Sequence, residues 1–212
     1  MAAQGQGLLA VWMDIPAAVE EDFNRWYDEE HLAERAGIPG FLNARRYRAL
    51  QGAPKYIALY DTVDARVLQS DPYLKVANNP TPWTQRLRPH FQNFVRNEYE
   101  LIFSLGTIPE KASPYVLLVR LEIDPGHDDE FNDWYNTDHL PALTKVPGVS
   151  GARRYRATVG APTYLAVYEI ANADVSKSEA WRKAADSPWT LRMRRLYRDL
   201  TMNLGQLTKA IP

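Results

Sequence analysis

Short apolar runs alternate with helically spaced apolar residues along the first half of the chain. Runs of strand length predict strands, whereas apolar residues at 19, 23, 26 and 27 have the spacing of an amphipathic helix. Turn residues at 51–54, between two such runs, predict a hairpin. The order is β-α-β-β-α-β, which gives an antiparallel sheet with both helices on one face. The predicted strands are residues 8–15, 41–49, 56–61 and 99–105, and the predicted helical regions are residues 19–36 and 82–94.

The third predicted strand is apolar on both faces. Ile57 and Leu59 point to one face, and Tyr56, Ala58 and Tyr60 point to the other. The two helices cover one face of the sheet, so the other face needs a second layer. The chain supplies that layer, because the same pattern occurs twice.

The repeat is visible without gaps. Shifting the sequence by 108 positions places residues 8–61 on residues 116–169, and 23 of the 54 pairs are identical. Gly, Pro and Ser collect at residues 106–113, as in a linker. We therefore divide the chain into a first repeat, residues 1–108, and a second repeat, residues 109–212. The predicted fold class is α+β, with two tandem ferredoxin-like βαββαβ repeats packed sheet to sheet as a fused pseudo-dimeric α+β barrel.

Composition and charge narrow the class of partner. The 212 residues are 45% hydrophobic and 24% charged, and the net charge of -1 gives no electrostatic basis for binding nucleic acid or an anionic membrane. The absence of cysteine excludes disulfides, thiolate metal sites and cysteine nucleophiles. Residues 1–7 lack the basic start and apolar core of a signal peptide, and the sequence has no apolar run of membrane-spanning length. We expect a soluble, cytoplasmic protein.

The first predicted helix carries the most informative residues. Tyr27 and His31 lie four positions apart, at the margin of an apolar face that also holds Phe23 and Trp26. Leu32 is predicted on the opposite side. A partly buried histidine has a pKa suited to general acid–base catalysis, and a neighbouring tyrosine donates a hydrogen bond to a developing oxyanion.

The second repeat keeps this pair as Tyr135 and His139. Glu30 in the first repeat and Asp138 in the second are candidates for orienting the imidazole. A structural role stays open, because a histidine near a helix end also caps carbonyls or pairs with a carboxylate. Retention in both repeats favours function only weakly, since structural residues also survive duplication.

Arginines on the second predicted strand are the next candidates. Alternation sends Arg46 to one face and Arg45 to the other, and Arg154 repeats Arg46. An interior arginine needs an ion pair or an anionic ligand. Arg46 and Arg154 are therefore candidate clamps for a substrate carboxylate or enolate, and an ion pair to an acidic residue such as Glu30 or Asp14 is the alternative.

Aromatic residues complete the candidate set, either as core or as the wall of a pocket. The candidate catalytic residues are His31, Tyr27, His139 and Tyr135, and the candidate substrate contacts are Trp26, Trp134, Arg46, Arg154, Tyr56, Tyr60, Tyr164 and Tyr168. Each repeat shares only one histidine, and the sequence has no His-Glu-x-x-His, GxGxxG, P-loop or nucleophile elbow. We expect no metal site and no cofactor.

One composite pattern runs through both repeats: Phe-x-x-Trp-Tyr-x-x-x-His-Leu, then Pro-Gly, then Ala-Arg-Arg-Tyr-Arg, at residues 23–48 and 131–156. It resembles the dimeric α+β barrel superfamily, in particular its EthD-like and related branches. Most members carry one copy and pair as dimers, so this chain resembles a fused version. The resemblance implies a pocket between sheet and helices lined by His and Tyr. It also spans cofactor-free monooxygenases, polyketide cyclases, isomerases, lyases and haem enzymes.

We expect a small-molecule enzyme that uses cofactor-independent His/Tyr acid–base chemistry on a small aromatic or carbonyl compound, as a lyase, isomerase, cyclase or monooxygenase. The alternatives are a non-catalytic small-molecule binding protein and a haem-binding protein with His31 or His139 as ligand. The repeats differ at Trp12, which becomes Arg120, and at Phe41, which becomes Val149. These differences allow one pocket to be active and the other degenerate. Further association of the fused pair into a homo-oligomer stays open.

Overall fold

A computed structural model describes residues 5–212; residues 1–4, part of the N-terminal segment considered above, lie outside the described residues. The strands are β1 (Gly7–Asp14), β2 (Ala44–Gln51), β3 (Tyr56–Thr62), β4 (Gln92–Gly106), β5 (Tyr115–Ile123), β6 (Val149–Val159), β7 (Tyr164–Ile170) and β8 (Tyr197–Ile211). The α-helices are α1 (Glu20–Trp26), α2 (Leu32–Ala36), α3 (Asp71–Asn78), α4 (Pro82–Leu87), α5 (Asp128–Trp134), α6 (Leu140–Leu143), α7 (Glu179–Ala185) and α8 (Pro188–Met193). Two π-helical turns, η2 (Tyr27–His31) and η5 (Tyr135–His139), and short 3-10 turns join them.

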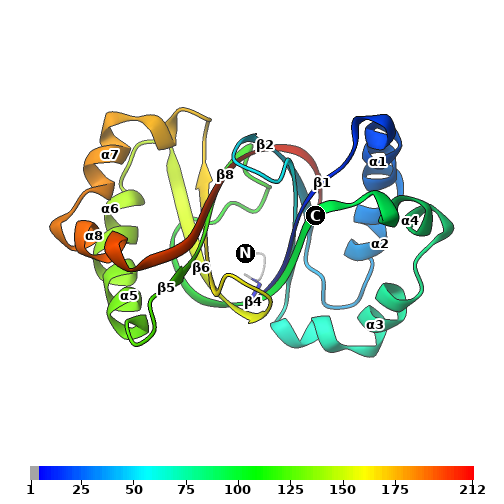
Figure 1. Ribbon diagram of the computed structural model, residues 1–212, viewed down its shortest axis with the longest axis horizontal. Helices are drawn as coiled ribbons and strands as arrows, with labels where there is room; N and C mark the ends of the chain where they lie inside the picture. Colours follow the sequence, from blue (N-terminus) through cyan, green and yellow to red (C-terminus); the bar gives the residue numbers. More distant parts are fainter. Residues whose placement is uncertain (1–4) are drawn as a thin grey trace.

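The eight strands close into one barrel in the order β1-β3-β2-β8-β5-β7-β6-β4. The strands of the first half are neighbours, as are those of the second half, and the halves meet at two antiparallel seams, β2–β8 and β4–β6. Figure 1 shows the barrel in the centre, with the helices of each half outside it on opposite sides. Within residues 5–212, no helix is both long and apolar enough to span a membrane.

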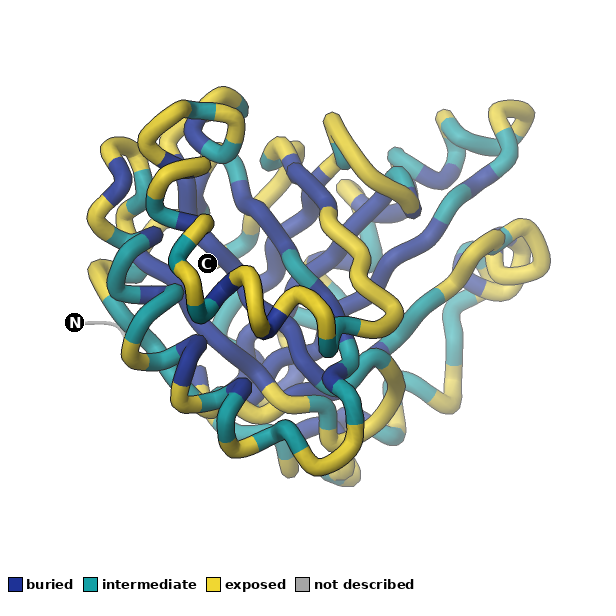
Figure 2. Tube along the Cα trace, turned by 60° about the vertical axis from the view of Figure 1, so that its left-hand side comes forward, coloured by how far each residue is buried: buried dark blue, intermediate teal, exposed yellow. Residues whose placement is uncertain are grey.

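Strand alternation separates the interior of the barrel from its outer face. Ile57 and Leu59 of β3 belong to an apolar cluster that mixes both halves, whereas Tyr56, Ala58 and Tyr60 belong to the cluster under the first-half helices. The two faces of β3 are therefore both covered, as the sequence pattern requires. Figure 2 shows the buried strands at the centre and exposed segments at the periphery.

The helix predicted at residues 19–36 is interrupted by η2. A π-helical turn holds one extra residue relative to an α-helical turn, so it rotates the following residues around the helix axis. Leu32 is fully buried for this reason, and its predicted position on the opposite side is wrong. Both halves contain the same interruption at the same place.

The second helical region also differs from the prediction. Only residues Pro82–Leu87 form α4, and β4 already begins at Gln92, so Phe94 lies in a strand. The sequence analysis missed α3 and its counterpart α7. Both of these helices begin after a serine N-cap, whose side chain accepts a hydrogen bond from the third helical residue.

Each hairpin has one glycine at a point where it meets the opposite half of the barrel. Gly52 and Gly160 have φ of +82° and +97°, in the left-handed region that favours glycine. A Cβ on Gly52 would lie 2.0 Å from the carbonyl oxygen of Met202, and one on Gly160 would lie 2.3 Å from Oδ1 of Asn97. The β2–β3 and β6–β7 turns therefore press directly against the opposite half.

Candidate functional site

A cavity of about 360 Å³ lies between the outer face of the first-half sheet and its helices. One wall comes from β1, β3 and β4, and the other from α1, η2, α2 and α3. Its lining includes Tyr27 and His31, together with Trp26, Tyr60 and Arg35. The volume lies within the range of about 300–1,000 Å³ typical of small-molecule sites.

His31 is the central polar group of the first-half wall. Its ring stacks on Trp26, with ring centroids 4.2 Å apart and planes 25° apart. Its Nδ1 lies 3.3 Å from Oε2 of Glu34, so the carboxylate beside this imidazole is Glu34. Glu30, which the sequence analysis favoured, instead accepts a hydrogen bond from Thr81 at 2.6 Å. With Nδ1 turned to Glu34, Nε2 is the ring nitrogen left for a ligand.

Burial sets the protonation state of His31. The side chain is 13% exposed, and desolvation lowers the pKa of His31, with Glu34 opposing the shift and Arg35 adding to it. The imidazole is therefore neutral at neutral pH. A neutral, buried imidazole in the cavity lining can accept a proton from a ligand.

The indole of Trp26, on which the His31 ring stacks, is held in place by α4. Its indole Nε1 donates to Oγ1 of Thr84 at 3.0 Å. Thr81, the N-cap of α4, accepts from the backbone N–H of Thr84 at 3.1 Å. Pro82 is the first residue of α4, a position that suits proline, so the start of the helix is well defined here.

Two phenols face the imidazole. The rings of Tyr27 and Tyr60 meet the His31 ring edge-on, at centroid distances of 5.3 Å and 6.5 Å. Burial raises the pKa of Tyr27, and burial followed by the neighbouring Tyr27 raises the pKa of Tyr60 well above its usual value. Both hydroxyls therefore stay protonated as donors. Within residues 5–212 the buried Tyr60 hydroxyl makes no well-aligned hydrogen bond, although Tyr27 lies beside it.

Charged residues form another part of the lining. Arg96 Nη2 donates to the hydroxyl of Tyr73 at 2.7 Å and to Oε1 of Glu98 at 2.8 Å. Glu98 also accepts from Gln69 at 2.8 Å. Arg35 lies over the Tyr73 ring, 5.7 Å from its centroid. The sequence analysis named none of these residues.

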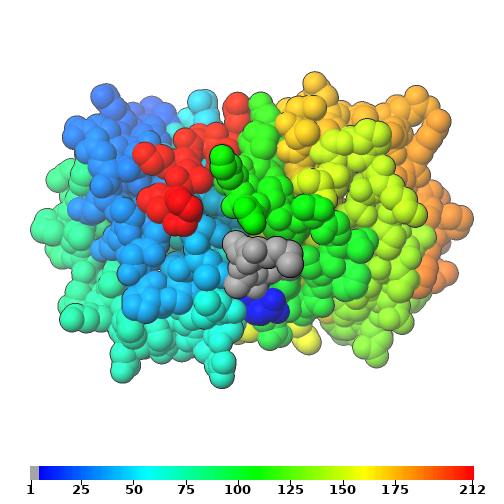
Figure 3. Space-filling view, turned by 180° about the vertical axis from the view of Figure 1, so that it is seen from behind, coloured from blue at the N-terminus to red at the C-terminus, as the bar shows by residue number. Residues whose placement is uncertain are grey.

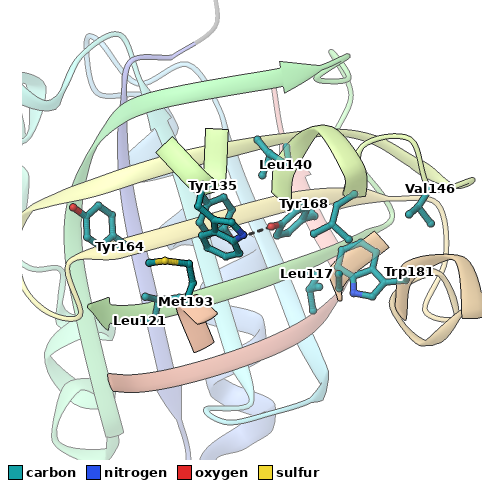
Figure 4. Close-up of a cluster of buried hydrophobic side chains, with 14 of the residues drawn as sticks. Leu117, Leu121, Tyr135, Leu140, Val146, Tyr164, Tyr168, Trp181 and Met193 are labelled. Carbon is teal, nitrogen blue, oxygen red and sulfur yellow. Dashed lines mark hydrogen bonds between the residues drawn. The ribbon is translucent and has the colours of Figure 1, made fainter. Parts of the chain in front are cut away.

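The corresponding cavity of the second half has a volume of about 130 Å³. His139 and Tyr135 line it, and the Tyr135 hydroxyl is hydrogen-bonded to that of Tyr168 at 2.9 Å. Trp181 packs on Tyr168 at a centroid distance of 5.3 Å. It is the third residue of α7, the position that Tyr73 holds in α3 of the first half. Figure 4 shows Tyr135, Tyr168 and Trp181 gathered in this cluster.

His139 is a buried imidazole, as His31 is. Its ring lies 4.5 Å from that of Trp134, and its Nδ1 lies 3.5 Å from Oγ1 of Thr190. Burial, with the charges of Arg194 and Arg154, lowers the pKa of His139 to about 3. Asp138 accepts from Ser187 at 2.5 Å and does not orient the imidazole.

Arg46 and Arg154 lie outside both cavity linings. Arg46 donates to Asn24 at 2.5 Å and covers the Tyr27 ring at 4.5 Å. Arg154 donates to Asn132 at 2.8 Å and covers the Tyr135 ring at 4.3 Å. Both arginines hold the helix to the sheet behind the tyrosines.

The strand tyrosines divide in the same way in both halves. Tyr60 and Tyr168 line the cavities, whereas Tyr56 and Tyr164 bond to residues at the start of α1 and α5. Tyr56 donates to Glu20, and Tyr164 donates to Asp128 at 2.6 Å. Trp26 lines its cavity, and Trp134 lies behind the second one, donating to Thr190 at 3.1 Å.

A third cavity, of about 380 Å³, lies at one mouth of the barrel. The segment 108–113 and the C-terminal end of β8 line it, and Figure 3 shows these two segments side by side on one face. The inner charged lining comprises Arg45, Arg153, Asp61 and Glu169. These four residues pair with one another, so the arginine on the barrel-facing side of β2 forms an ion pair and does not need a ligand.

Within residues 5–212, no group of three His, Asp or Glu side chains is arranged to hold a metal ion. The polar groups gathered in the first cavity include a histidine, tyrosines and arginines. Comparing the two repeats position by position would have pointed to Arg35, which is Leu143 in the second repeat.

No protein-family model matches the chain, and no curated protein matches it. Similarity appears only among solved structures. An anthrone oxidase-like protein aligns over 99% of this chain and 93% of its own, with a TM-score of 0.73 and 10% identity.

Two further structures align over nearly the whole chain. A proposed monooxygenase from Fusobacterium nucleatum subsp. nucleatum covers 99% of this chain and 95% of its own, with a TM-score of 0.62 and 9% identity. A mutant chlorite dismutase from Candidatus Nitrospira defluvii covers 98% and 92%, with a TM-score of 0.63 and 13% identity. At these identities the likeness shows the fold alone, which is a closed eight-stranded barrel of the dimeric α+β barrel type.

Proposed function

We propose that the first-half cavity is the active site of a small-molecule enzyme in which His31 acts as a general base. The observation that carries the proposal is a buried, neutral imidazole that shares one cavity with two protonated phenols, Tyr27 and Tyr60. The aromatic lining suits a small aromatic or carbonyl compound.

The proposed first step is proton abstraction from a carbon next to a carbonyl. Nε2 of His31 takes the proton, and the electron pair of the broken C–H bond moves onto the carbonyl oxygen. The hydroxyls of Tyr27 and Tyr60 donate to the resulting enolate oxygen. A lyase, isomerase, cyclase or cofactor-free monooxygenase can each begin with this step, and none of these beginnings requires a cofactor.

We also propose that the two halves are fused ferredoxin-like repeats, residues 1–108 and 109–212, that have diverged from an EthD-like ancestor. Their shared element order, paired π-helical turns and repeated sequence support this interpretation. A cavity of about 150 Å³ holds a benzene-sized molecule, so the second cavity, at about 130 Å³, has little room for a substrate. The first half would then hold the active pocket.

The names of the fold neighbours agree with a small-molecule enzyme, since they include an anthrone oxidase-like protein and proposed monooxygenases. A haem fits the first cavity poorly. The macrocycle with its propionates is larger than a 360 Å³ space. We derive no step through such a group.

The test is hydrogen–deuterium exchange at the α-carbon of 2-tetralone in D2O, followed by proton NMR. We expect the wild-type protein to accelerate exchange and His31→Gln to lose that acceleration, typically by about 10²–10⁴-fold. The matched variant His139→Gln should exchange at the wild-type rate. Exchange by His31→Gln at the wild-type rate would rule out His31 as the base, and binding of 2-tetralone without exchange would favour a non-catalytic binding protein.

A further inference from the structure

Two hydrogen-bond donors of the first cavity are poorly satisfied. Within residues 5–212, Nη1 of Arg35 is buried without a hydrogen bond, and the buried hydroxyl of Tyr60 has no well-aligned partner, although Tyr27 lies beside it. The Arg35 side chain is 12% exposed, and Tyr60 is 1% exposed. Both residues line the same cavity. A buried donor without an acceptor destabilises the folded state, so two such donors in one cavity indicate that a ligand supplies the acceptor.

The positive charge of Arg35 is also less engaged than that of Arg96, the other partly buried arginine of the lining. Arg96 is held by Glu98 and Tyr73 at 2.8 Å and 2.7 Å. Arg35 has a looser ion pair, with its Nε 3.8 Å from Glu34, whose Oε2 also lies near His31. A guanidinium with free N–H groups binds carboxylates in a planar, directional geometry.

The second half shows what the cavity lining looks like without these features. Leu143 stands where Arg35 stands, and the Tyr168 hydroxyl is bonded to Tyr135. Leu143 and Met202 make that lining largely apolar. The second cavity also has an arginine, Arg194, but that charge is paired with Asp186 at 2.7 Å. A guanidinium at the position of Arg35 is therefore specific to the larger cavity.

We infer that the first cavity takes an aromatic substrate that bears an oxyanion, preferably a carboxylate, bound by Nη1 of Arg35 and the hydroxyl of Tyr60. This inference rests on the proposed function and adds the chemical class of its substrate. The apolar body of the ligand would lie against the aromatic lining that includes Trp26 and Phe91.

The test compares 2-naphthoate with 2-naphthamide, a neutral compound of nearly the same shape, by isothermal titration calorimetry. Wild-type protein should bind the acid at least about tenfold more tightly than the amide, since hydrogen bonds to a charged group discriminate on this scale. Arg35→Leu, which copies position 143, should remove the preference and leave amide binding unchanged. Arg35→Lys should keep part of the preference.

The wild-type comparison stands even where a variant fails to fold. Equal binding of acid and amide by the wild-type protein would overturn the charge inference and leave the proposed site standing. Failure of both compounds to bind at millimolar concentration would count against the site and the inference together. An unchanged preference in folded Arg35→Leu would also overturn the role of Arg35.

Discussion

Arg153 in the second half donates to both carboxylate oxygens of Asp61 in the first half, at 3.2 Å each. Arg45 binds the same carboxylate at 2.8 Å and reaches across to Glu169 at 3.4 Å. Burial opposes ionisation of Asp61, yet Arg153 and Arg45 lower its pKa to about 2. Each half therefore supplies charges that the other half neutralises inside the barrel.

Replacing Asp61 should expose how far the two halves depend on this network. Asp61→Asn leaves two buried arginines with one carboxylate, and breaking a buried pair typically costs about 3–5 kcal/mol. Urea unfolding followed by tryptophan fluorescence measures the loss. Glu179→Gln, which removes an exposed pair with Lys183, should change the free energy of unfolding by less than about 1 kcal/mol. Equal effects of the two substitutions would contradict the assigned role.

The tyrosine pairs offer a second comparison between the halves. Tyr60→Phe removes a buried hydroxyl that has no well-aligned hydrogen bond, so the ligand-free protein should be no less stable. Tyr168→Phe removes a hydrogen bond to Tyr135 and should cost about 1 kcal/mol. Thermal unfolding separates the two cases. A clear loss of stability in Tyr60→Phe would show that this hydroxyl is satisfied within the protein.

The stacking of His31 on Trp26 can be tested by removing the hydrogen bond that holds the indole in place. Thr84→Val leaves the Trp26 N–H unsatisfied and should cost about 1–3 kcal/mol, as should Thr190→Val for Trp134. Only Thr84→Val should slow the exchange of 2-tetralone, because only the first cavity is proposed to react. If Thr190→Val slowed exchange equally, the assignment of the active pocket to the first half would be wrong.

The buried histidine of the second half predicts acid sensitivity. His139 has a folded-state pKa of about 3, below its ordinary value of 6.5, so the unfolded chain binds the extra proton between these pH values. Stability is then lost as pH falls below 6.5, by up to about 1.4 kcal/mol per pH unit from this group. His139→Gln should have a shallower slope between pH 6 and pH 4. The same change at exposed His90 should leave the slope as it is in the wild type.

The β-α-β-β-α-β order could be predicted from strand and helix periodicity. Closure of the barrel could be predicted because Ile57 and Leu59 need a second layer to cover them. It could not place Leu32, since the π-helical turn at residues 27–31 adds a residue that helical periodicity does not reveal. The short helices α3 and α7 escaped for a related reason. Their two turns are too brief to establish a period.

The sequence analysis named part of the lining of the first cavity. His31, Tyr27, Trp26 and Tyr60 come together in one cavity, because adjacent helical turns and an adjacent strand position them. The charge of Arg46 suggested that it would bind a substrate anion. Its guanidinium instead lies behind Tyr27, over the face of that ring. Arg35 was not recognised, because the sequence analysis did not compare it with Leu143 of the second repeat and did not predict α3, which supplies Tyr73 beside it.

The seams β2–β8 and β4–β6 join two halves of one polypeptide. When the halves of a barrel are separate molecules, dilution pulls them apart, and the temperature of unfolding depends on protein concentration. Here the seams close within a single chain, and the partner strand is always present at a fixed effective concentration. The barrel should therefore keep the same melting temperature at nanomolar and at millimolar protein.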